Sequence, residues 1–454
     1  MRKCFVLICC ISFVLSFIKP AFASEEELMA EIKVLKAKLA DMDELKARVT
    51  ELEKQVNEQK HTLIQQEGTV TEVKKSLIDY KPGEGLKLKP YGLNIQAGAT
   101  FVLQGTPDAN NAGGREKSRF DASWSSDIFI EKEFDDWGLA LIHLEPGQGD
   151  TVEPELSVYS NVNRDTNDTG ADVPVTELWY EHYLFNKQIA FTFGKLDPAN
   201  YVDQNEYAFD ETTQFLGRIF RNSPAIEWPD DNTLGSRLIL APAEMPYMSL
   251  EAAYFDADND WEQVFNDPFV SVQLNLKPYS IFDADSEQWD GNYRLYWWIN
   301  CRDHSKLVAA GKPDTDEAER INTGFGLSCD QMLTDEFGIF GRFGWQRPDV
   351  EIVSTNPNAA PVEFSWSGGL QMTGKRWNRP DDVLACAVGQ LFPSKEYKDA
   401  GHGGSAEGHL ELYYKLQILK YLALTPDFQL VWNPRGVDET DPIFVYGLRG
   451  QVDF

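Results

Sequence analysis

The stretch FVYGLRGQVDF at residues 444–454 ends the chain and decides its fold class. Every second residue from Phe444 to Phe454 is apolar or glycine, and the positions between them are mostly polar. This period of two is typical of a β-strand with one apolar and one wet face. A closed outer-membrane barrel needs such a strand to pair with the first strand and remove the sheet edges. The final strand of a soluble β-sandwich is the alternative reading.

The same alternation recurs through residues 91–454. The first strand is expected at residues 93–103, and further segments of about ten residues fit the strand length of a transmembrane barrel. The clearest are residues 177–185, 189–194, 293–300, 336–345, 364–373 and 409–419. Loops rich in Asp, Asn, Pro and Gly separate them, for example residues 161–173 and 303–319. At roughly 22 residues per strand and turn, this region predicts about 16 antiparallel strands around an aqueous channel.

Residues 1–23 read as a secretory signal peptide. Arg2 and Lys3 precede the apolar run 4–18, and Ala21-Phe22-Ala23 forms a cleavage site. The run is shorter than the roughly 20 residues of a membrane-spanning helix. Removing the signal would change the net charge from −30 to about −33, and this acidity argues against nucleic acid as a partner. An exported protein that crosses a membrane with strands belongs in the bacterial outer membrane of a Gram-negative cell.

Residues 24–80 have a helical pattern instead. Apolar residues recur in steps that alternate between four and three, which is the seam spacing of a coiled coil. A helix of this length would reach roughly 80 Å and would pair with copies of itself. We therefore expect a periplasmic coiled coil and a homo-oligomer, with a trimer as one possible state. The helix breaker and turn KPGEG, residues 81–85, opens a linker over residues 81–90.

Nothing in the sequence indicates an enzyme, a metal or a cofactor. Cleavage of the signal leaves Cys301, Cys329 and Cys386, which we expect to be free thiols. The acidic run 256–260 begins like a calcium loop, but it lacks the glycine and glutamate that an EF-hand needs. The histidines and cysteines do not have zinc-ligand spacing, and the chain has no nucleophile-elbow motif.

Three groups of motifs, spread over roughly residues 90–454, match one porin family. They are LELYY (410–414), LTPDFQLVWNP (424–434) and YGLR (446–449); GLQMTG (369–374) with RPDDVL (379–384); and GKLDP (194–198), DQN (203–205), QFL (214–216) and NSPA (222–225). In these stretches the chain resembles the carbohydrate-selective porins of the OprB type. The resemblance implies a 16-stranded outer-membrane porin that passes monosaccharides passively, and the coiled coil lies outside the matched region.

Strand alternation suggests a first set of pore-lining residues, because selectivity depends on pore diameter and lining groups. The expected inward positions, together with a basic cluster near residue 375, are Glu177, Trp179, Glu181, Arg294, Trp298, Arg342, Lys375, Arg376 and Arg379. Pairing of arginine with glutamate across the pore is the sharpest expectation from this set.

The segment 197–232 supplies a second set. It is long and aperiodic, and long connections of this kind tend to be functional. We expect it to fold into the barrel mouth as a constriction that carries Asp203, Asn205, Arg218 and Arg221.

The sequence thus predicts an all-β transmembrane barrel preceded by an α-helical coiled coil. The expected function is passive diffusion of small carbohydrates, such as glucose, across the outer membrane. Two alternatives stay open: a general or cation-preferring diffusion porin, and a structural tether between the outer membrane and the cell wall.

Overall fold

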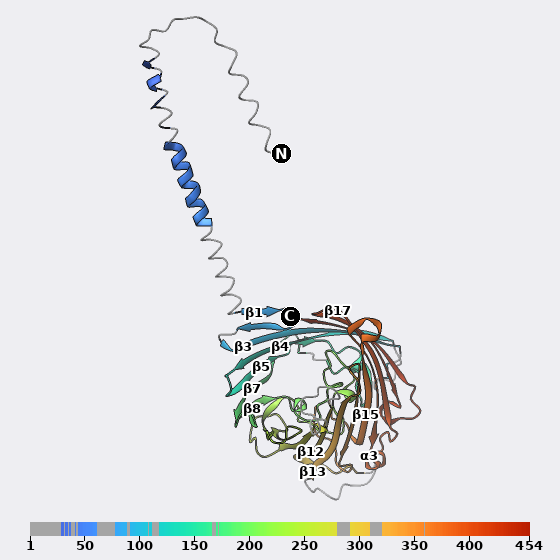
Figure 1. Ribbon diagram of the computed structural model, residues 1–454. Coiled ribbons are helices and arrows are strands. Elements are labelled where there is room, and N and C mark those ends of the chain that lie inside the picture. The colour runs from blue at the N-terminus through green and yellow to red at the C-terminus, as the bar shows by residue number, and fades with distance from the viewer. Residues whose placement is uncertain are drawn as a thin grey trace. The chain divides into compact units, whose positions relative to one another are not determined.

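A computed structural model describes most of the chain (Figure 1). The described residues are 29–30, 32–34, 36–37, 41, 44–60, 78–88, 91–107, 109–110, 118–165, 169–170, 172–278, 291–308, 320–357 and 359–454. Contacts divide the chain into two units, Met1–Ser76 and Leu77–Phe454. The signal peptide predicted for residues 1–23 lies outside the described residues.

In the first unit, residues 44–60 form a continuous helix. Four of its apolar side chains follow the seam spacing of four, three and four residues and are each 49–62% exposed: Leu45, Val49, Leu52 and Val56. No helix among the described residues is long and apolar enough to span a membrane. Residues 61–77 of the predicted coiled coil are not described. Residues 78–80 belong to a strand. The predicted coiled coil, residues 24–80, is therefore wrong for its last three residues.

The second unit is a closed antiparallel barrel. The described chain contains one sheet of nineteen strands, and all of them except β1, β2 and β6 form a ring of sixteen. The ring strands, in order, are β3 (Leu93–Thr106), β4 (Arg119–Glu133), β5 (Gly138–Leu144), β7 (Val175–Leu184), β8 (Ile189–Leu196), β9 (Thr233–Leu240), β10 (Met248–Asp256), β11 (Pro268–Leu276), β12 (Gly291–His304), β13 (Arg320–Met332), β14 (Phe337–Gln346), β15 (Val362–Gly374), β16 (Arg379–Pro393), β17 (Glu407–Leu419), β18 (Leu422–Trp432) and β19 (Ile443–Asp453).

The last strand closes the ring as predicted. β19 pairs with β3, with Tyr446 opposite Gly105 and Val452 opposite Ala99. The linker forms a hairpin of β1 (Ile78–Lys81) and β2 (Gly85–Leu88), and β2 pairs with the start of β3. The short β6 (Gly147–Gln148) continues the pairing of β4 beyond β5. Gly85 has a φ of +83°, and a Cβ there would lie 2.3 Å from the Ile95 carbonyl oxygen, so only glycine fits this turn.

The two faces of each strand meet different surroundings. On β12, Leu295 and Trp297 are 54% and 45% exposed, whereas Tyr296 and Trp298 are at most 1% exposed. The exposed apolar side chains form the outer, lipid-facing surface that a membrane barrel requires. The buried side chains point inward, where loops cover them.

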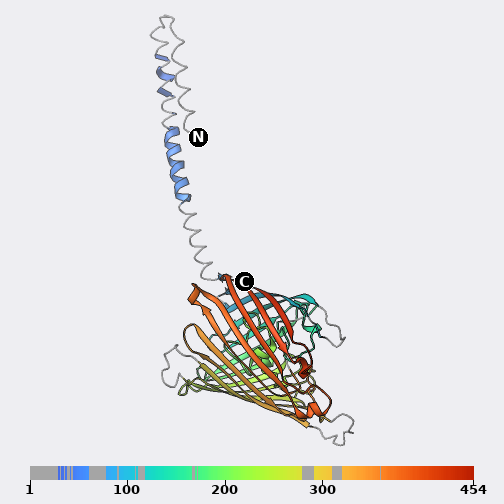
Figure 2. The same ribbon diagram turned by 90° about the vertical axis from the view of Figure 1, so that its right-hand side faces the viewer.

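The two ends of the barrel differ in their connections. At one end most turns are short, as between β17 and β18, although the longer connection 277–290 joins β11 to β12 there. The same end carries the start of β3 and the end of β19. At the other end the connections are long, as between β8 and β9 or β14 and β15. Short turns face the periplasm in outer-membrane barrels and long loops face outward. Figure 2 shows the long tilted strands between these two ends.

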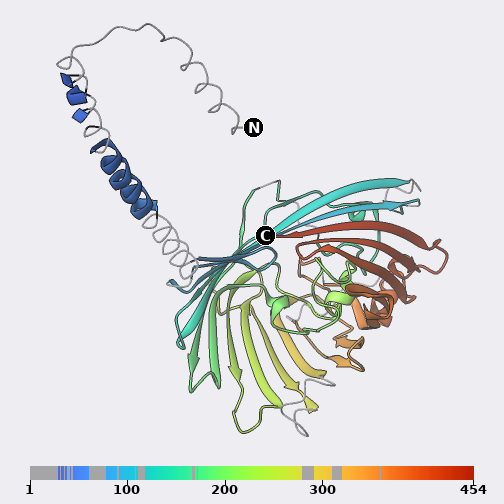
Figure 3. The ribbon, with the colours of Figure 1, turned by 45° about the horizontal axis from the view of Figure 1, so that its top comes forward.

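The core lies between one long connection and the inner wall. Residues 197–232, which include η3 (Pro198–Asn200) and α2 (Arg218–Arg221), fold inside the ring (Figure 3). Phe215, Ile219 and Phe220 pack against wall residues such as Phe340 and Tyr413. A second cluster joins residues of the same connection to the inner faces of β10, β11 and β12. The connection therefore fills the lumen beside β10–β17.

Candidate functional site

The segment 197–232 is anchored to the wall by a buried ion pair. Arg342 on β14 contacts Asp203 with an Nε–Oδ2 distance of 3.1 Å, and the two side chains are 1% and 0% exposed. Arg342 Nη2 also donates to the Asp203 carbonyl oxygen at 3.1 Å. Asn205 Nδ2 donates to Ser328 Oγ on β13 at 3.1 Å. These contacts fix the first third of the segment against the wall.

Two carboxylates on the inner face of β17 bind loop backbone. Glu411 accepts hydrogen bonds from the amides of Leu216 and Gly217 at 2.7 and 2.8 Å. Glu407 accepts from the amides of Tyr159 and Ser160 at 2.9 and 2.7 Å. The β17 strand therefore holds two inward loops, the segment 197–232 and the connection between β6 and β7.

Arginine–glutamate pairs join these two loops to one another. Arg218 lies 3.2 Å from Glu153, which belongs to η2 (Glu153–Glu155) in the β6–β7 connection. Glu211 pairs with Arg221 at 2.7 Å and with Arg164 at 3.7 Å. Burial alone would raise the pKa of Glu211, but the charges of Arg221 and Arg164 outweigh it and hold that pKa below its ordinary value.

Glu227 ties a third loop to the same core. Its carboxylate accepts hydrogen bonds from the amides of Val353 and Ser354 at 2.8 and 3.0 Å. The same group lies 2.8 Å from His304 Nε2 and accepts from Asn322 Nδ2 at 2.6 Å. The β14–β15 connection is thereby held against the segment 197–232.

Three adjoining cavities run along the opposite side of the lumen. An outer cavity of about 340 Å³ shares lining residues with a middle cavity of about 350 Å³. The middle cavity in turn shares Asp127, Phe129 and Thr212 with an inner cavity of about 180 Å³. The inner cavity reaches the β1–β2 hairpin and Phe454, at the end with short turns. The series therefore passes from the long loops to the periplasmic end.

Four of the described residues line both the outer and the middle cavity, namely Glu145, Arg164, Asp197 and Asn232. We call this set the narrowing. Its groups are two carboxylates, a guanidinium and an amide, which can all hydrogen-bond a hydroxyl-rich solute. Burial raises the pKa of Glu145, in the β5–β6 connection, to about 7; the charge of Asp127 adds to this rise and Arg164 opposes it.

The middle cavity also has aromatic walls. Phe129 on β4 stacks on His143 of β5 with ring centroids 4.2 Å apart. Phe209 lines the same cavity and lies under the Arg221 guanidinium, 4.6 Å from its ring centroid. The middle cavity is thus lined by both polar groups and aromatic rings.

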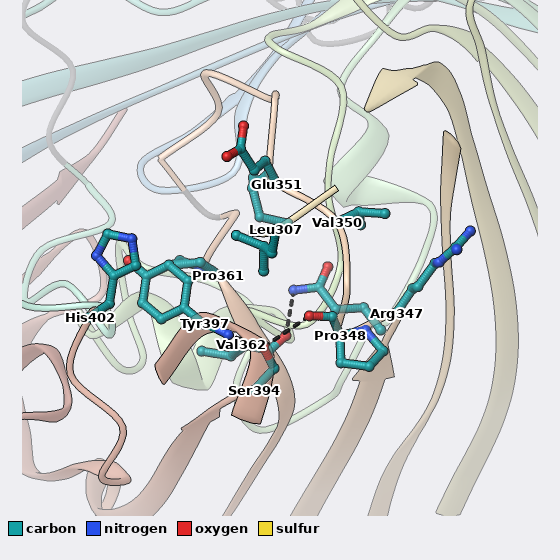
Figure 4. Close-up of a pocket in the computed structure, with 12 residues that line it drawn as sticks. Leu307, Arg347, Pro348, Val350, Glu351, Pro361, Val362, Ser394, Tyr397 and His402 are labelled. Atoms are coloured by element: carbon teal, nitrogen blue, oxygen red, sulfur yellow. Dashed lines mark hydrogen bonds between the residues drawn. The ribbon is translucent and has the colours of Figure 1, made fainter. Parts of the chain in front are cut away.

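A further cavity of about 340 Å³ lies among the outer loops (Figure 4). Its lining mixes apolar side chains, such as Leu307 and Val350, with polar ones, such as Glu351. Tyr397 stacks on His402 there, with ring centroids 4.1 Å apart. In Figure 4, Arg347 points away from the other lining side chains. Its described lining has no residue in common with the three adjoining cavities, so it stands apart from their series.

The structure places the predicted site residues in three groups. Arg218 lines the outer cavity and Arg221 the middle one. A second group is buried beneath the inward loops or paired along the inner wall: Glu177, Trp179, Glu181, Asp203, Asn205, Arg294, Trp298 and Arg342. Arg294, for example, pairs with Asp330 on the neighbouring strand at 2.5 Å. The predicted fold of the segment 197–232 into the barrel matches the structure.

The third group lies at the periplasmic end. Lys375 and Arg376 occupy η5 (Lys375–Trp377) in the β15–β16 turn and pair with Asp335 at 2.9 Å and Glu336 at 2.6 Å. Arg379 pairs with Asp382 at 2.5 Å. These three basic residues line none of the three adjoining cavities. The turn that clusters them in sequence places them away from the narrowing.

Sequence reasoning missed most of the narrowing. Arg164 lies within residues 161–173, which we read only as a loop, and Glu145 in the β5–β6 connection was not singled out. Asp197 and Asn232 were included only as the ends of the segment 197–232. His143 and Asp127 lie on strands whose inward faces we did not assign. The available signal was the alternation of β4 and β5, which puts both side chains on the wet face.

A closed sixteen-strand barrel with inward loops and a continuous series of polar cavities defines the class of outer-membrane diffusion porins. Within this class, the family model "Carbohydrate-selective porin, OprB family" matches residues 19–454, and the chain belongs to that family. The match includes residues 24–80, so the expectation that the predicted coiled coil lies outside the matched region is wrong. Small sugars are the solutes that this membership implies, and the family consists of channels rather than enzymes.

Individual relatives are distant. The structure of Pseudomonas putida OprB at high pH is similar with a TM-score of 0.65 and 16% identity, over 81% of this chain and 95% of that one. The DcaP channel of Acinetobacter baumannii is similar with a TM-score of 0.51 and 10% identity, over 80% and 97%. An uncharacterized protein of Aquifex aeolicus is 24% identical over 305 residues, which are 66% of this chain and 75% of that protein. At these identities the two structures support the fold.

Proposed function

We propose that this porin passes monosaccharides such as glucose through the three adjoining cavities. The observation that supports this most is the narrowing, where Glu145, Arg164, Asp197 and Asn232 face one path. Their acceptors and donors match the hydroxyls of a sugar, and Phe129 and Phe209 offer apolar ring faces. Transport would be passive, with selectivity set by pore size and lining groups.

Planar-bilayer conductance tests the proposal. Glucose is titrated against linear polyols that carry similar hydroxyl groups but have no ring to lie on an aromatic face. We expect concentration-dependent block of the ion current by glucose and weaker block by the polyols. Arg164→Ala should weaken the glucose block, and Arg376→Ala, at the periplasmic turn, serves as the matched control. Current without glucose block in the unmodified protein would contradict a sugar-selective lumen.

A general, cation-preferring diffusion porin is the second candidate. The narrowing holds two carboxylates and one guanidinium, and the chain carries a net charge of −30. Such a site attracts cations and repels anions. A strong cation preference together with equal passage of glucose and other small solutes would favour this function.

We also infer that the N-terminal helix pairs with copies of itself in the periplasm. The exposed stripe Leu45, Val49, Leu52 and Val56 supports this, because such a seam is stable only when another helix covers it. The chain enters the barrel at the end with short turns, which suits a periplasmic location. A trimer and a contact with the cell wall extend this inference, and a tether function would depend on the latter.

A further inference from the structure

Three potential metal ligands meet on neighbouring positions of β4 and the β5–β6 segment. His143 and Glu145 are two residues apart and therefore project from the same face of their segment. The strand register pairs Phe129 with His143, which places Asp127 across from Glu145. The alternation of both segments thus brings an imidazole and two carboxylates together on the lumen side.

The geometry of this group suits a metal ion. One ligand atom from each of Asp127, His143 and Glu145 can be chosen so that all three lie within 4.8 Å of one another. His143 Nε2 already lies 2.9 Å from Asp127 Oδ1. A metal at roughly 2.0–2.2 Å from nitrogen and oxygen ligands needs only small side-chain rotations from this arrangement. Phe129, stacked on the imidazole at an interplanar angle of 16°, restricts the orientation of the ring.

We propose that Asp127, His143 and Glu145 bind a divalent transition-metal ion, with Zn²⁺ as the probe. Imidazole nitrogen with carboxylate oxygen is a ligand set of Zn²⁺ and its neighbours, whereas Mg²⁺ and Ca²⁺ favour oxygen ligands alone. All three residues line the middle cavity of about 350 Å³, which has room for water molecules at the remaining coordination positions. The site is therefore open to ions that enter the pore.

Occupation of the site would change permeation. Glu145 is both a metal ligand and a member of the narrowing, where Arg164 and Asp197 are its neighbours. A bound dication would remove negative charge from the narrowing and would narrow the space that a solute can use. Zn²⁺ would therefore lower the current of cations and the passage of sugars.

The other carboxylate group of the described chain provides a contrast. Asp256, Asp258 and Asp260 also approach one another closely, at the β10–β11 connection among the long loops. This group offers oxygen ligands only and lines none of the three adjoining cavities. It supplies a control for non-specific binding to acidic side chains.

Direct binding is the first test. Zn²⁺ binding to the purified barrel in detergent is measured by titration calorimetry for the unmodified protein and for His143→Phe, Asp127→Asn and Glu145→Gln. His143→Phe keeps a ring on Phe129 but has no nitrogen ligand. Each change should weaken the Zn²⁺ site at least about tenfold, since even partners of metal ligands contribute 10–100-fold. His182→Phe and Asp258→Asn are the matched controls and should leave this site unchanged.

Conductance is the second test, and each variant is compared with itself before and after Zn²⁺ so that its own basal current does not matter. Zn²⁺ should lower the current of the unmodified channel, and Mg²⁺ at the same concentration should not. The block should disappear in the ligand variants and persist in the controls. Equal Zn²⁺ affinity in the unmodified protein and all three ligand variants, or equal block by Mg²⁺, would overturn the proposal. Heat-modifiable migration in gel electrophoresis checks that each variant is a folded barrel, and Glu145→Gln keeps the test decisive if one of the other two fails to fold.

Discussion

Arg342 and Asp203 form an ion pair of 3.1 Å in which both side chains are almost fully buried. The arginine belongs to the wall and the aspartate to the inward segment 197–232, so this pair joins the loop to the barrel. Neither residue lines one of the three adjoining cavities. We therefore expect both to affect permeation by positioning the segment that carries Asp197 and Asn232 of the narrowing.

Arg342→Ala should destabilise the protein by about 3–5 kcal/mol, because it leaves the carboxylate of Asp203 buried without its partner. The released loop should also raise and broaden the single-channel current. Chemical denaturation in detergent micelles measures the first effect, and bilayer recording measures the second.

Arg376→Ala provides the matched control, since Arg376 pairs with Glu336 at 2.6 Å but is 62% exposed. Exposed ion pairs contribute about 0–1 kcal/mol, so stability and current should hardly change. Equal effects of the two arginine substitutions would contradict a positioning role for the Arg342–Asp203 pair.

The charges of the narrowing should set ion selectivity. Arg164→Ala removes the one guanidinium that it contains and should raise the permeability ratio of K⁺ to Cl⁻. Well above pH 7, where Glu145 is ionised in spite of its raised pKa, Glu145→Gln removes a negative charge and should lower that ratio. Reversal potentials in a KCl gradient measure both changes. Shifts in the same direction for the two variants would show that this set does not control the ion path.

Much of the barrel could be predicted because its signal is local. The alternation of residues 444–454 reports a lipid face and a wet face, and Phe444, Tyr446 and Leu448 are indeed exposed while Arg449 is 1% exposed. The two faces of a strand can be predicted from this pattern without knowing which distant residues contact it. It also correctly indicated the inward face of β12.

The narrowing could not be predicted in the same way because loops from distant parts of the chain build it. Arg164 and Glu145 line the same cavities although they belong to different connections. Glu407 and Glu411 on β17 hold two of the inward loops in place through backbone amides. Alternation identified Arg342 as inward, but it cannot show that a loop covers it. Lys375 shows a similar limit. The sequence groups it with other basic residues, but it does not show that their turn lies at the periplasmic end, away from the narrowing.

Glu227 should make the inward loops sensitive to acid. Burial alone would raise the pKa of Glu227. The interaction with His304 and the hydrogen bonds from Asn322 and Val353 lower it by more, so the pKa of Glu227 lies below its ordinary value of 4.5. A lowered carboxyl pKa contributes stability that is fully present above the ordinary value and is lost as the pH falls through the lowered one. Thermal unfolding should therefore occur at lower temperature as the pH drops below 4.5.

Glu227→Gln tests the source of this acid sensitivity. The variant should unfold at a lower temperature at neutral pH, because a neutral amide replaces the carboxylate that binds His304 and two backbone amides. As the pH falls below 4.5, the unfolding temperature of the variant should then decrease less than that of the unmodified protein. An unchanged acid dependence would assign the effect to other carboxyl groups.

Deletion of residues 24–76 should separate assembly from conduction. The barrel unit starts at Leu77 and β1 at Ile78, so this deletion leaves the hairpin and the ring of strands complete. If Leu45, Val49, Leu52 and Val56 form a helix–helix seam, the deletion variant should be monomeric by light scattering in detergent while the full-length protein is oligomeric. Single-channel conductance per barrel should stay the same, because every described residue that lines the three cavities belongs to the barrel unit. A tether to the cell wall would instead show itself as loss of co-sedimentation with peptidoglycan. A folded deletion variant that does not conduct would show that the helix takes part in transport.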